Sequence, residues 1–375
     1  MRRILFLLAF LLLPGLAMAQ TPDKYRVYLG TSASKLSKGI YHCELDLKDG
    51  KLSNVQLAAE MTNPNFLAIH PNQKFLYAVG TGDKKVTGVV AFSIDAKTGN
   101  LTQLNAVTSG GAGPCHVAVD ATGKTVMAAN YGAGSCCSIP IGPDGKLGEG
   151  GSVIQHEGKS ILPNQKGPHA HSINLDKANK FAFCADLGID KVLVYKLDTA
   201  KGTLTLNSTF DTPAGSGPRH FAFHPNGKWA YINGEMSMTL IACDYDADKG
   251  MLKQRQIITT LPKDETRKGG STAEVVVHPS GKFVYVSNRD PYNSLAIFSV
   301  ESSGELKAVG HEARGIKTPR NFAIEPTGQY LIAANQSGND VISFRINQST
   351  GELTPTGSRV EVGAPICVRF MPMGK

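Results

Sequence analysis

Short stretches of alternating apolar and polar residues, separated by turns rich in glycine and proline, recur along most of the chain. Alternation with a period of two is typical of strands that bury one face. The segments Trp229-Ala-Tyr-Ile and Phe283-Val-Tyr-Val-Ser are examples, and each follows a turn of the form His-Pro-x-Gly-Lys. The pattern therefore predicts short antiparallel strands joined by hairpins.

One unit of this pattern recurs seven times. It begins with a Pro or Thr that opens a short apolar strand, and the steps between these markers are 46 to 54 residues. Each complete unit contains four predicted strands, counting this first one. Such a period, with four strands per unit, is typical of β-propeller blades and not of helical repeats. The markers are Pro64, Pro114, Pro168, Pro218, Thr272, Pro319 and Pro365.

The two ends of the chain complement each other. Residues 25–58 contain three predicted strands but no first strand, whereas residues 365–370 contain a first strand alone. We predict that they form one blade and close the ring, which removes exposed sheet edges. The expected fold is all-β, a seven-bladed propeller of four-stranded antiparallel blades, in a single domain over residues 20–375.

Residues 1–19 have the three parts of a signal peptide. Arg2 and Arg3 precede ten apolar residues, and the small residues Ala17 and Ala19 end the segment. The apolar run is too short to span a bilayer. We therefore expect a chain that is exported, either periplasmic or secreted, and that has no stable membrane insertion after the signal is removed.

Composition narrows the possible partners. The formal net charge of +8 is spread along the chain without a dense basic cluster, so a nucleic acid partner is not expected. The seven cysteines lie mostly in apolar, strand-like runs, and no Cys/His spacing indicates zinc. We interpret the cysteines as small buried apolar residues and leave their disulfide pattern open. Neither a cofactor nor a metal is expected, and the sequence does not indicate the oligomeric state.

The repeat also predicts a site. In an antiparallel blade, the first strand starts at the same end of the ring where the second strand stops. Four successive units, those beginning at Gly167, Gly217, Ser271 and Thr318, carry charged or imidazole side chains there. We expect these side chains to converge on one mouth of the central channel, although salt bridges between blades are the alternative. They are His171, Arg219, His220, Glu235, Glu274, Arg289 and Arg320, with Asn130 and Gln336 as further polar candidates.

At these residues the sequence resembles the seven-bladed β-propeller lactonases, which include the bacterial propeller type of 6-phosphogluconolactonase, and it is similar to fungal carboxymuconate cyclases. The matching stretches are Gly217-Pro-Arg-His-Phe-Ala-Phe-His, Ser271-Thr-Ala-Glu and Pro319-Arg-Asn-Phe. The resemblance implies hydrolysis of 6-phosphogluconolactone without a metal, an activity of the pentose phosphate pathway. Members in that pathway act in the cytoplasm, so the export signal is a departure.

The resemblance to the cyclases assigns catalytic roles to four of the residues, His171, Arg219, Glu235 and Arg289. The remaining five, His220, Glu274, Arg320, Asn130 and Gln336, are candidates for substrate binding.

Absent motifs narrow the mechanism. The chain contains neither a Gly-x-Ser-x-Gly nucleophile elbow nor a His-Glu-x-x-His zinc motif. We therefore expect direct attack by water on an anionic or sugar-derived lactone, with Glu235 or His171 as the base. A Glu beside two arginines is a weak base, because nearby positive charge lowers its pKa. A non-catalytic exported binding or scaffold propeller and a muconate lactone cycloisomerase are the alternatives.

Overall fold

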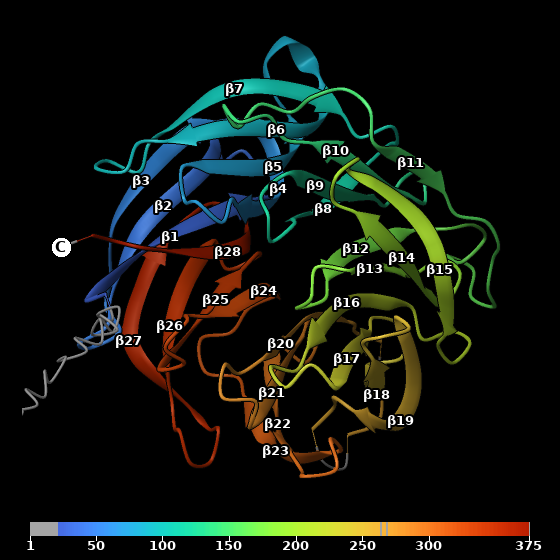
Figure 1. Cartoon of the computed structure of the whole chain (residues 1–375). Coiled ribbons are helices and arrows are strands. Elements are labelled where there is room, and N and C mark those ends of the chain that lie inside the picture. Colours follow the sequence, from blue (N-terminus) through green and yellow to red (C-terminus); the bar gives the residue numbers. More distant parts are fainter. Residues whose placement is uncertain (1–21, 263–264, 268, 375) are drawn as a thin grey trace, which may run out of the picture.

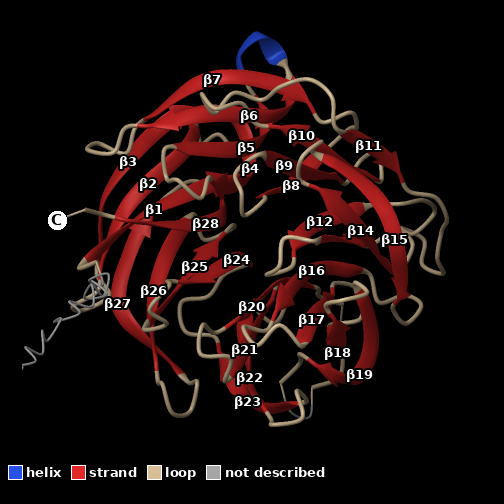
Figure 2. Ribbon diagram, in the orientation of Figure 1, coloured by secondary structure: helices blue, strands red, loops and turns tan. Residues whose placement is uncertain are grey.

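Seven sheets, each of four antiparallel strands, stand around a central axis like the blades of a propeller (Figure 1). The computed structural model describes residues 22–262, 265–267 and 269–374, so the expected signal peptide at 1–19 lies outside the described residues. Within these ranges one 3-10 turn, η1 (Asp83–Lys85), is the only helical element (Figure 2). No helix among the described residues is long and apolar enough to cross a membrane. The predicted all-β architecture is confirmed.

Six blades consist of consecutive strands that follow one another from the axis outward (Figure 1). The first three are β4 (Thr62–Ile69), β5 (Phe75–Thr81), β6 (Thr87–Ile94) and β7 (Leu101–Thr108); β8 (Pro114–Val119), β9 (Thr125–Asn130), β10 (Ser135–Pro140) and β11 (Ser152–Gln155); and β12 (Ala170–Leu175), β13 (Phe181–Asp186), β14 (Lys191–Asp198) and β15 (Thr203–Asp211). The other three are β16 (Pro218–Phe223), β17 (Trp229–Gly234), β18 (Thr239–Asp246) and β19 (Met251–Thr259); β20 (Thr272–Val277), β21 (Phe283–Asn288), β22 (Ser294–Val300) and β23 (Leu306–Glu312); and β24 (Pro319–Ile324), β25 (Tyr330–Asn335), β26 (Asp340–Ile346) and β27 (Leu353–Glu361).

The seventh blade joins the two ends of the chain, as predicted. Its sheet order is β28-β1-β2-β3, from β28 (Pro365–Pro372), β1 (Lys24–Thr31), β2 (Gly39–Asp46) and β3 (Leu52–Glu60). β28 pairs antiparallel with β1 and takes the innermost place. The last strand of the chain therefore closes the ring.

Burial explains the hydrophobic pattern of the strands. Blades stack face to face, so an inner strand such as β21 is covered on both sides and all six of its residues are buried. The outermost strand β19 has mostly exposed residues and retains polar–apolar alternation. Apolar side chains between neighbouring blades form the core, as Phe183, Phe221 and Tyr245 do between the blades of β12–β15 and β16–β19.

Repeated hydrogen bonds connect each blade to the next. A tyrosine in the second strand donates its hydroxyl to a glycine carbonyl in the turn between the third and fourth strands of the following blade. Tyr285 Oη, for example, lies 2.8 Å from the Gly351 carbonyl. Gly351 has a φ of +77°, and a Cβ there would lie 2.5 Å from the Phe283 ring. The same bond joins Tyr28 to Gly99, Tyr77 to Gly145 and Tyr231 to Gly304.

The histidines of the first hairpin turns form a second set of ties between blades. Their Nδ1 accepts from the backbone N–H two residues on, so these side chains cap the turns. Nε2 of His278 also contacts the Gly328 carbonyl of the next blade, 2.8 Å away. His70 and His224 make the equivalent contacts with Gly123 and Gly281. These turns lie at the end of the ring opposite the predicted site.

The innermost strands share an irregularity at their starts. In the β12–β13 pair the register shifts between Ala170 and Ser172, which leaves His171 unpaired. Register shifts at the equivalent place leave Arg219 and His220 unpaired in β16, and Arg320 unpaired in β24. A β-bulge of this kind bends the strand and changes the direction of a side chain. The bulges therefore lie at the residues that the sequence predicts for the site.

Candidate active site

A cavity of about 300 Å³ opens where the innermost strands begin and the second strands end. A smaller cavity of about 70 Å³ shares His171 and Arg320 with it and is also lined by Arg219 and His220. The expected convergence of these side chains on one mouth of the channel is therefore present. The larger cavity is lined by Asn63, Asn65, Gly80, Thr81, Thr87, Gly113, Pro114, Cys115, Tyr131, His171, Glu235 and Arg320.

Glu235 lies between two arginines from its own and the following blade. Arg289 Nη2 donates to Glu235 Oε1 at 2.7 Å and also contacts the Thr272 carbonyl at 3.2 Å. Arg219 Nε lies 2.8 Å from Glu235 Oε2 in an ion pair whose N–H is not aligned for a hydrogen bond. Arg219 Nη1 donates to the Ala273 carbonyl at 2.6 Å. Both carboxylate oxygens therefore face a guanidinium.

Burial and charge shift the pKa values of these groups. Desolvation is the main effect on Arg219, which is 2% exposed, and lowers its pKa to about 9. Burial alone would raise the pKa of Glu235, but Arg219 and Arg289 together hold it below the ordinary value. Glu235 is therefore ionised near neutral pH and attracts protons weakly.

Arg320 is the guanidinium without a partner in this group. It lines both cavities, and among the described residues no hydrogen bond or ion pair to it is found. Burial and the nearby Arg289 lower its pKa from the ordinary value. Three arginines and one carboxylate give the mouth a net positive charge, and Arg320 is free to bind an anionic or developing negative oxygen.

His171 lies at the bulge of β12 between the two cavities. Its ring packs edge-on against Tyr131 and His220, at centroid distances of 5.5 and 5.4 Å. Neither ring nitrogen has a hydrogen-bond partner among the described residues, and Nδ1 is fully enclosed. Burial, reinforced by Arg219, holds the pKa of His171 well below 6.5. The imidazole is therefore neutral near neutral pH.

His220 and Glu274 form a buried pair beside His171. His220 Nδ1 lies 2.7 Å from Glu274 Oε1, and Asn321 Nδ2 donates to the other carboxylate oxygen. Burial lowers the pKa of His220 despite the adjacent carboxylate. Glu274 does not line either cavity, so its contacts position His220 and do not reach a ligand there.

Like Glu274, two further predicted binding residues lie outside both cavities. Asn130 is fully buried, and its Nδ2 donates to the Ser109 carbonyl and to Ser135 Oγ, both at 3.0 Å. It therefore supports the blade. Gln336 follows β25, and its Nε2 donates to Ser32 Oγ of the closing blade at 3.2 Å.

Three neutral residues that line the larger cavity were not among the predicted site residues. Asn65, Cys115 and Tyr131 occupy the same repeat positions as the predicted charged residues, in the two preceding blades, and Thr81 is a fourth such residue. Their position in the repeat was the available signal, because their side chains are uncharged. Burial raises the pKa of the Cys115 thiol to about 12, which makes it a poor nucleophile.

No group of three or more metal-donor side chains is found at this mouth within the described part of the chain. The one such group there, Cys136, His156 and Cys184, lies between two blades. The only carboxylate that lines the cavity, Glu235, is neutralised by arginines. The mouth is therefore suited to binding an anion.

Comparison with known proteins agrees with the fold and identifies the family. Residues 26–370 match the family model described as Lactonase, 7-bladed beta-propeller. The chain is 37% identical to a 6-phosphogluconolactonase of Bacillus subtilis over 93% of its own length and 99% of the relative's. It is 34% identical to a 6-phosphogluconolactonase of Formosa agariphila, covering 85% and 91% of the two chains.

A solved structure has the same fold. The periplasmic gluconolactonase of Pseudomonas aeruginosa superposes with a TM-score of 0.87 at 29% identity, over 94% of this chain and all of that one. The chain therefore belongs to the seven-bladed β-propeller lactonase family. It is a lactonase, an enzyme that hydrolyses the cyclic ester of a lactone, and neither the scaffold nor the cycloisomerase alternative is favoured.

Proposed function

We propose that this lactonase hydrolyses an anionic sugar lactone of the 6-phosphogluconolactone type, with His171 as the general base. The observation that carries the proposal is an unpaired neutral imidazole and an unpaired guanidinium, His171 and Arg320, lining one cavity. The excess of arginine over carboxylate supports an anionic substituent on the substrate. Neither a metal nor a cofactor takes part in the proposed reaction.

The reaction proceeds in two proton transfers. His171 takes a proton from water as the water oxygen attacks the lactone carbonyl carbon, and Arg320 stabilises the oxyanion of the tetrahedral intermediate. The bond between the carbonyl carbon and the ring oxygen then breaks. The protonated imidazole returns the proton to the leaving alkoxide, so one water is consumed and a hydroxy acid is released.

Glu235 is the weaker candidate for the base. Its two oxygens are engaged by Arg219 and Arg289, and its lowered pKa reduces its proton affinity. We assign it the positioning of these two arginines against the substrate. The pKa of His171 is also low in the free enzyme, but an anion bound at the arginines offsets the positive charge that contributes to this shift.

Two matched substitutions separate these roles. His171→Ala should lower kcat/KM by roughly a hundred- to ten-thousand-fold, as expected for loss of a general base. Glu235→Gln should mainly raise KM, because the arginines lose their anchor. His224→Ala, at the opposite end of the ring, is the control for loss of an imidazole. Full activity of His171→Ala in a folded protein would contradict the assignment.

The same assay tests the substrate class. Phosphorylated and unphosphorylated glucono-lactones are compared, with spontaneous hydrolysis subtracted. We expect the phosphorylated lactone to have the higher kcat/KM. Arg320→Gln should lower kcat/KM for both lactones, because the carbonyl oxyanion is common to them. A preference for the neutral lactone would overturn the proposed substrate class while leaving the base assignment standing.

We also propose that the protein is exported and acts in the periplasm or outside the cell. The signal-like segment at 1–19 and the periplasmic relative support this. The proposal expects Gln20 as the first residue of the protein recovered from the cell envelope, which N-terminal sequencing reads directly. A chain that starts at Met1 and stays in the cytoplasm would refute it.

A further inference from the structure

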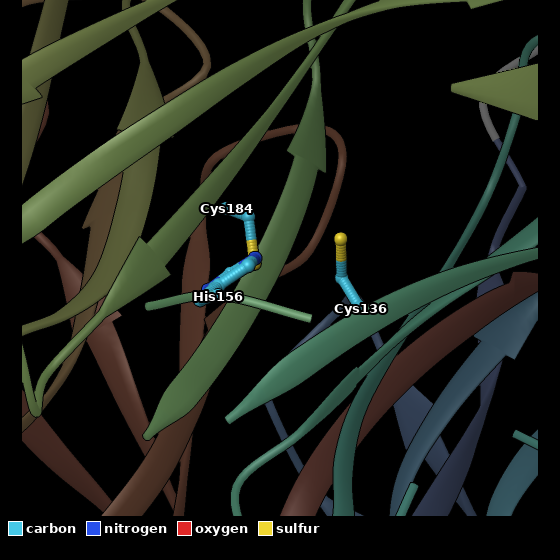
Figure 3. A group of neighbouring side chains, drawn as sticks. All are labelled: Cys136, His156 and Cys184. Carbon is cyan, nitrogen blue, oxygen red and sulfur yellow. The ribbon is translucent and has the colours of Figure 1, made fainter. Parts of the chain in front are cut away.

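Two thiols and an imidazole meet in the apolar layer between two neighbouring blades (Figure 3). Cys136 lies in β10, His156 follows β11, and Cys184 lies in β13 of the next blade. Their donor atoms are all within 4.8 Å of one another, and all three residues are buried. None of these residues lines the lactonase cavity.

The imidazole is oriented by its neighbours. Asp186 Oδ2 lies 2.6 Å from His156 Nδ1, so Nε2 is the nitrogen that would bind a metal. A carboxylate that holds the far nitrogen in this way is the usual second-sphere partner of a metal-binding histidine. The Tyr195 hydroxyl is hydrogen-bonded to Nε2 at 2.9 Å, and a metal ion bound at Nε2 would displace this bond.

The group departs from the repeat of the molecule. At the position of Asp186, the equivalent strands β9, β21 and β25 end in asparagine, and each asparagine donates its side-chain N–H to a backbone carbonyl of the loop before its blade. At the position of Cys184, the same strands carry alanine or valine. The residues equivalent to Cys136 in β22 and β26 are likewise apolar, Leu295 and Val341. The propeller therefore does not require a carboxylate–imidazole pair or thiols at this joint.

We propose that Cys136, His156 and Cys184 bind one thiophilic divalent metal ion, of which Zn²⁺ is the best match, and that the ion joins the two blades. Thiolate and imidazole are the ligands that zinc prefers in structural sites. Two sulfurs bound to one zinc at about 2.3 Å in a tetrahedron lie roughly 3.8 Å apart, which is compatible with the observed spacing. Binding would release the protons that the thiols and the imidazole of this group carry, and the two thiolates would balance the ionic charge.

Metal content provides the test, independently of lactone hydrolysis. The mature chain is produced without an affinity tag in medium containing Zn²⁺, passed through a gel filtration column in buffer with a chelator, and analysed by mass spectrometry of its elements. We expect about one zinc per chain. The double variant Cys136→Ser/Cys184→Ser should retain less than a tenth of this amount. Cys243→Ser, which changes an equally buried cysteine in another blade, should retain all of it.

A second measurement avoids reliance on variants. Growth with Co²⁺ in place of Zn²⁺ should give wild-type protein with a thiolate-to-cobalt charge-transfer band. Thiol titration of the wild-type chain, denatured and with its metal removed by a chelator, should give all seven cysteines as free thiols. Metal-free protein with seven thiols would overturn the proposal in favour of a hydrogen-bonded network. Metal-free protein with five thiols would overturn it in favour of a disulfide, and equal zinc in wild type and double variant would show binding elsewhere.

Discussion

At the scale of single residues, identical side chains differ in their bonding partners because of where the fold places them. Arg219 and Arg289 are bound to Glu235, whereas Arg320 lines the cavity without a partner. His278 ties two blades together, whereas His171 has no partner among the described residues. The unpaired members of each type are therefore the ones available for chemistry.

The pH profile follows from the low pKa of His171. A general base must be unprotonated, so kcat/KM should hold as the pH is lowered past 6.5 and fall only when it approaches the lower pKa of the buried imidazole. An anionic substrate raises this pKa, so the acid limb of kcat should lie at higher pH than that of kcat/KM. Initial rates measured with spontaneous hydrolysis subtracted check both limbs. An acid limb of kcat/KM at or above 6.5 would contradict the assignment.

Individual strands show what the sequence could and could not predict. The columns of the repeat predicted that His171, Arg219, Glu235, Arg289 and Arg320 share one mouth, because period and strand direction determine which ends meet. They could not predict how the bulges turn each side chain. Glu274 therefore lies behind His220. Asn130 is regularly paired in β9, and its side chain bonds within its own blade and the loop before it. The group of Cys136, His156 and Cys184 could not be predicted from cysteine spacing either, because the propeller brings these side chains together from two different blades.

Hydrogen bonds between elements should contribute measurably to stability. Tyr285→Phe removes the hydroxyl that the Gly351 carbonyl accepts and leaves that buried carbonyl unpaired. We expect a loss of roughly 1–2 kcal/mol in the free energy of unfolding. Tyr25→Phe is the matched control, because no hydrogen bond of the Tyr25 hydroxyl is found among the described residues. Denaturant unfolding of both variants makes the comparison, and equal losses would refute the role of this bond.

At the scale of the whole molecule, the two ends of the ring have different tasks. The hairpin-turn histidines at one end connect neighbouring blades, while the bulges at the other end direct ionisable groups into the cavity. A propeller permits this separation because each strand contributes one end to stability and the other to the site. The residues at the hairpin turns can therefore recur between blades, while the residues at the mouth differ from blade to blade.

Ring closure by β28 should be essential to folding. Deleting residues 363–375 removes buried side chains of β28, including Ile366 and Val368, and exposes the edge of β1 and a face of each neighbouring blade. Each buried aliphatic side chain contributes roughly 1.5–3 kcal/mol, so the loss is comparable to the net stability of a domain. We expect thermal unfolding at a much lower temperature, with aggregation. Deleting only 374–375 is the control, and equal melting temperatures would refute the prediction.

The position of β28 also determines when the protein can become complete. Three strands of the closing blade lie at the start of the chain, and the fourth is formed by its last residues. The ring closes only when β28 pairs with β1, so two segments from opposite ends of the described chain must meet before the propeller is complete. Pairing between segments so far apart in sequence forms slowly, so an open ring precedes the finished propeller.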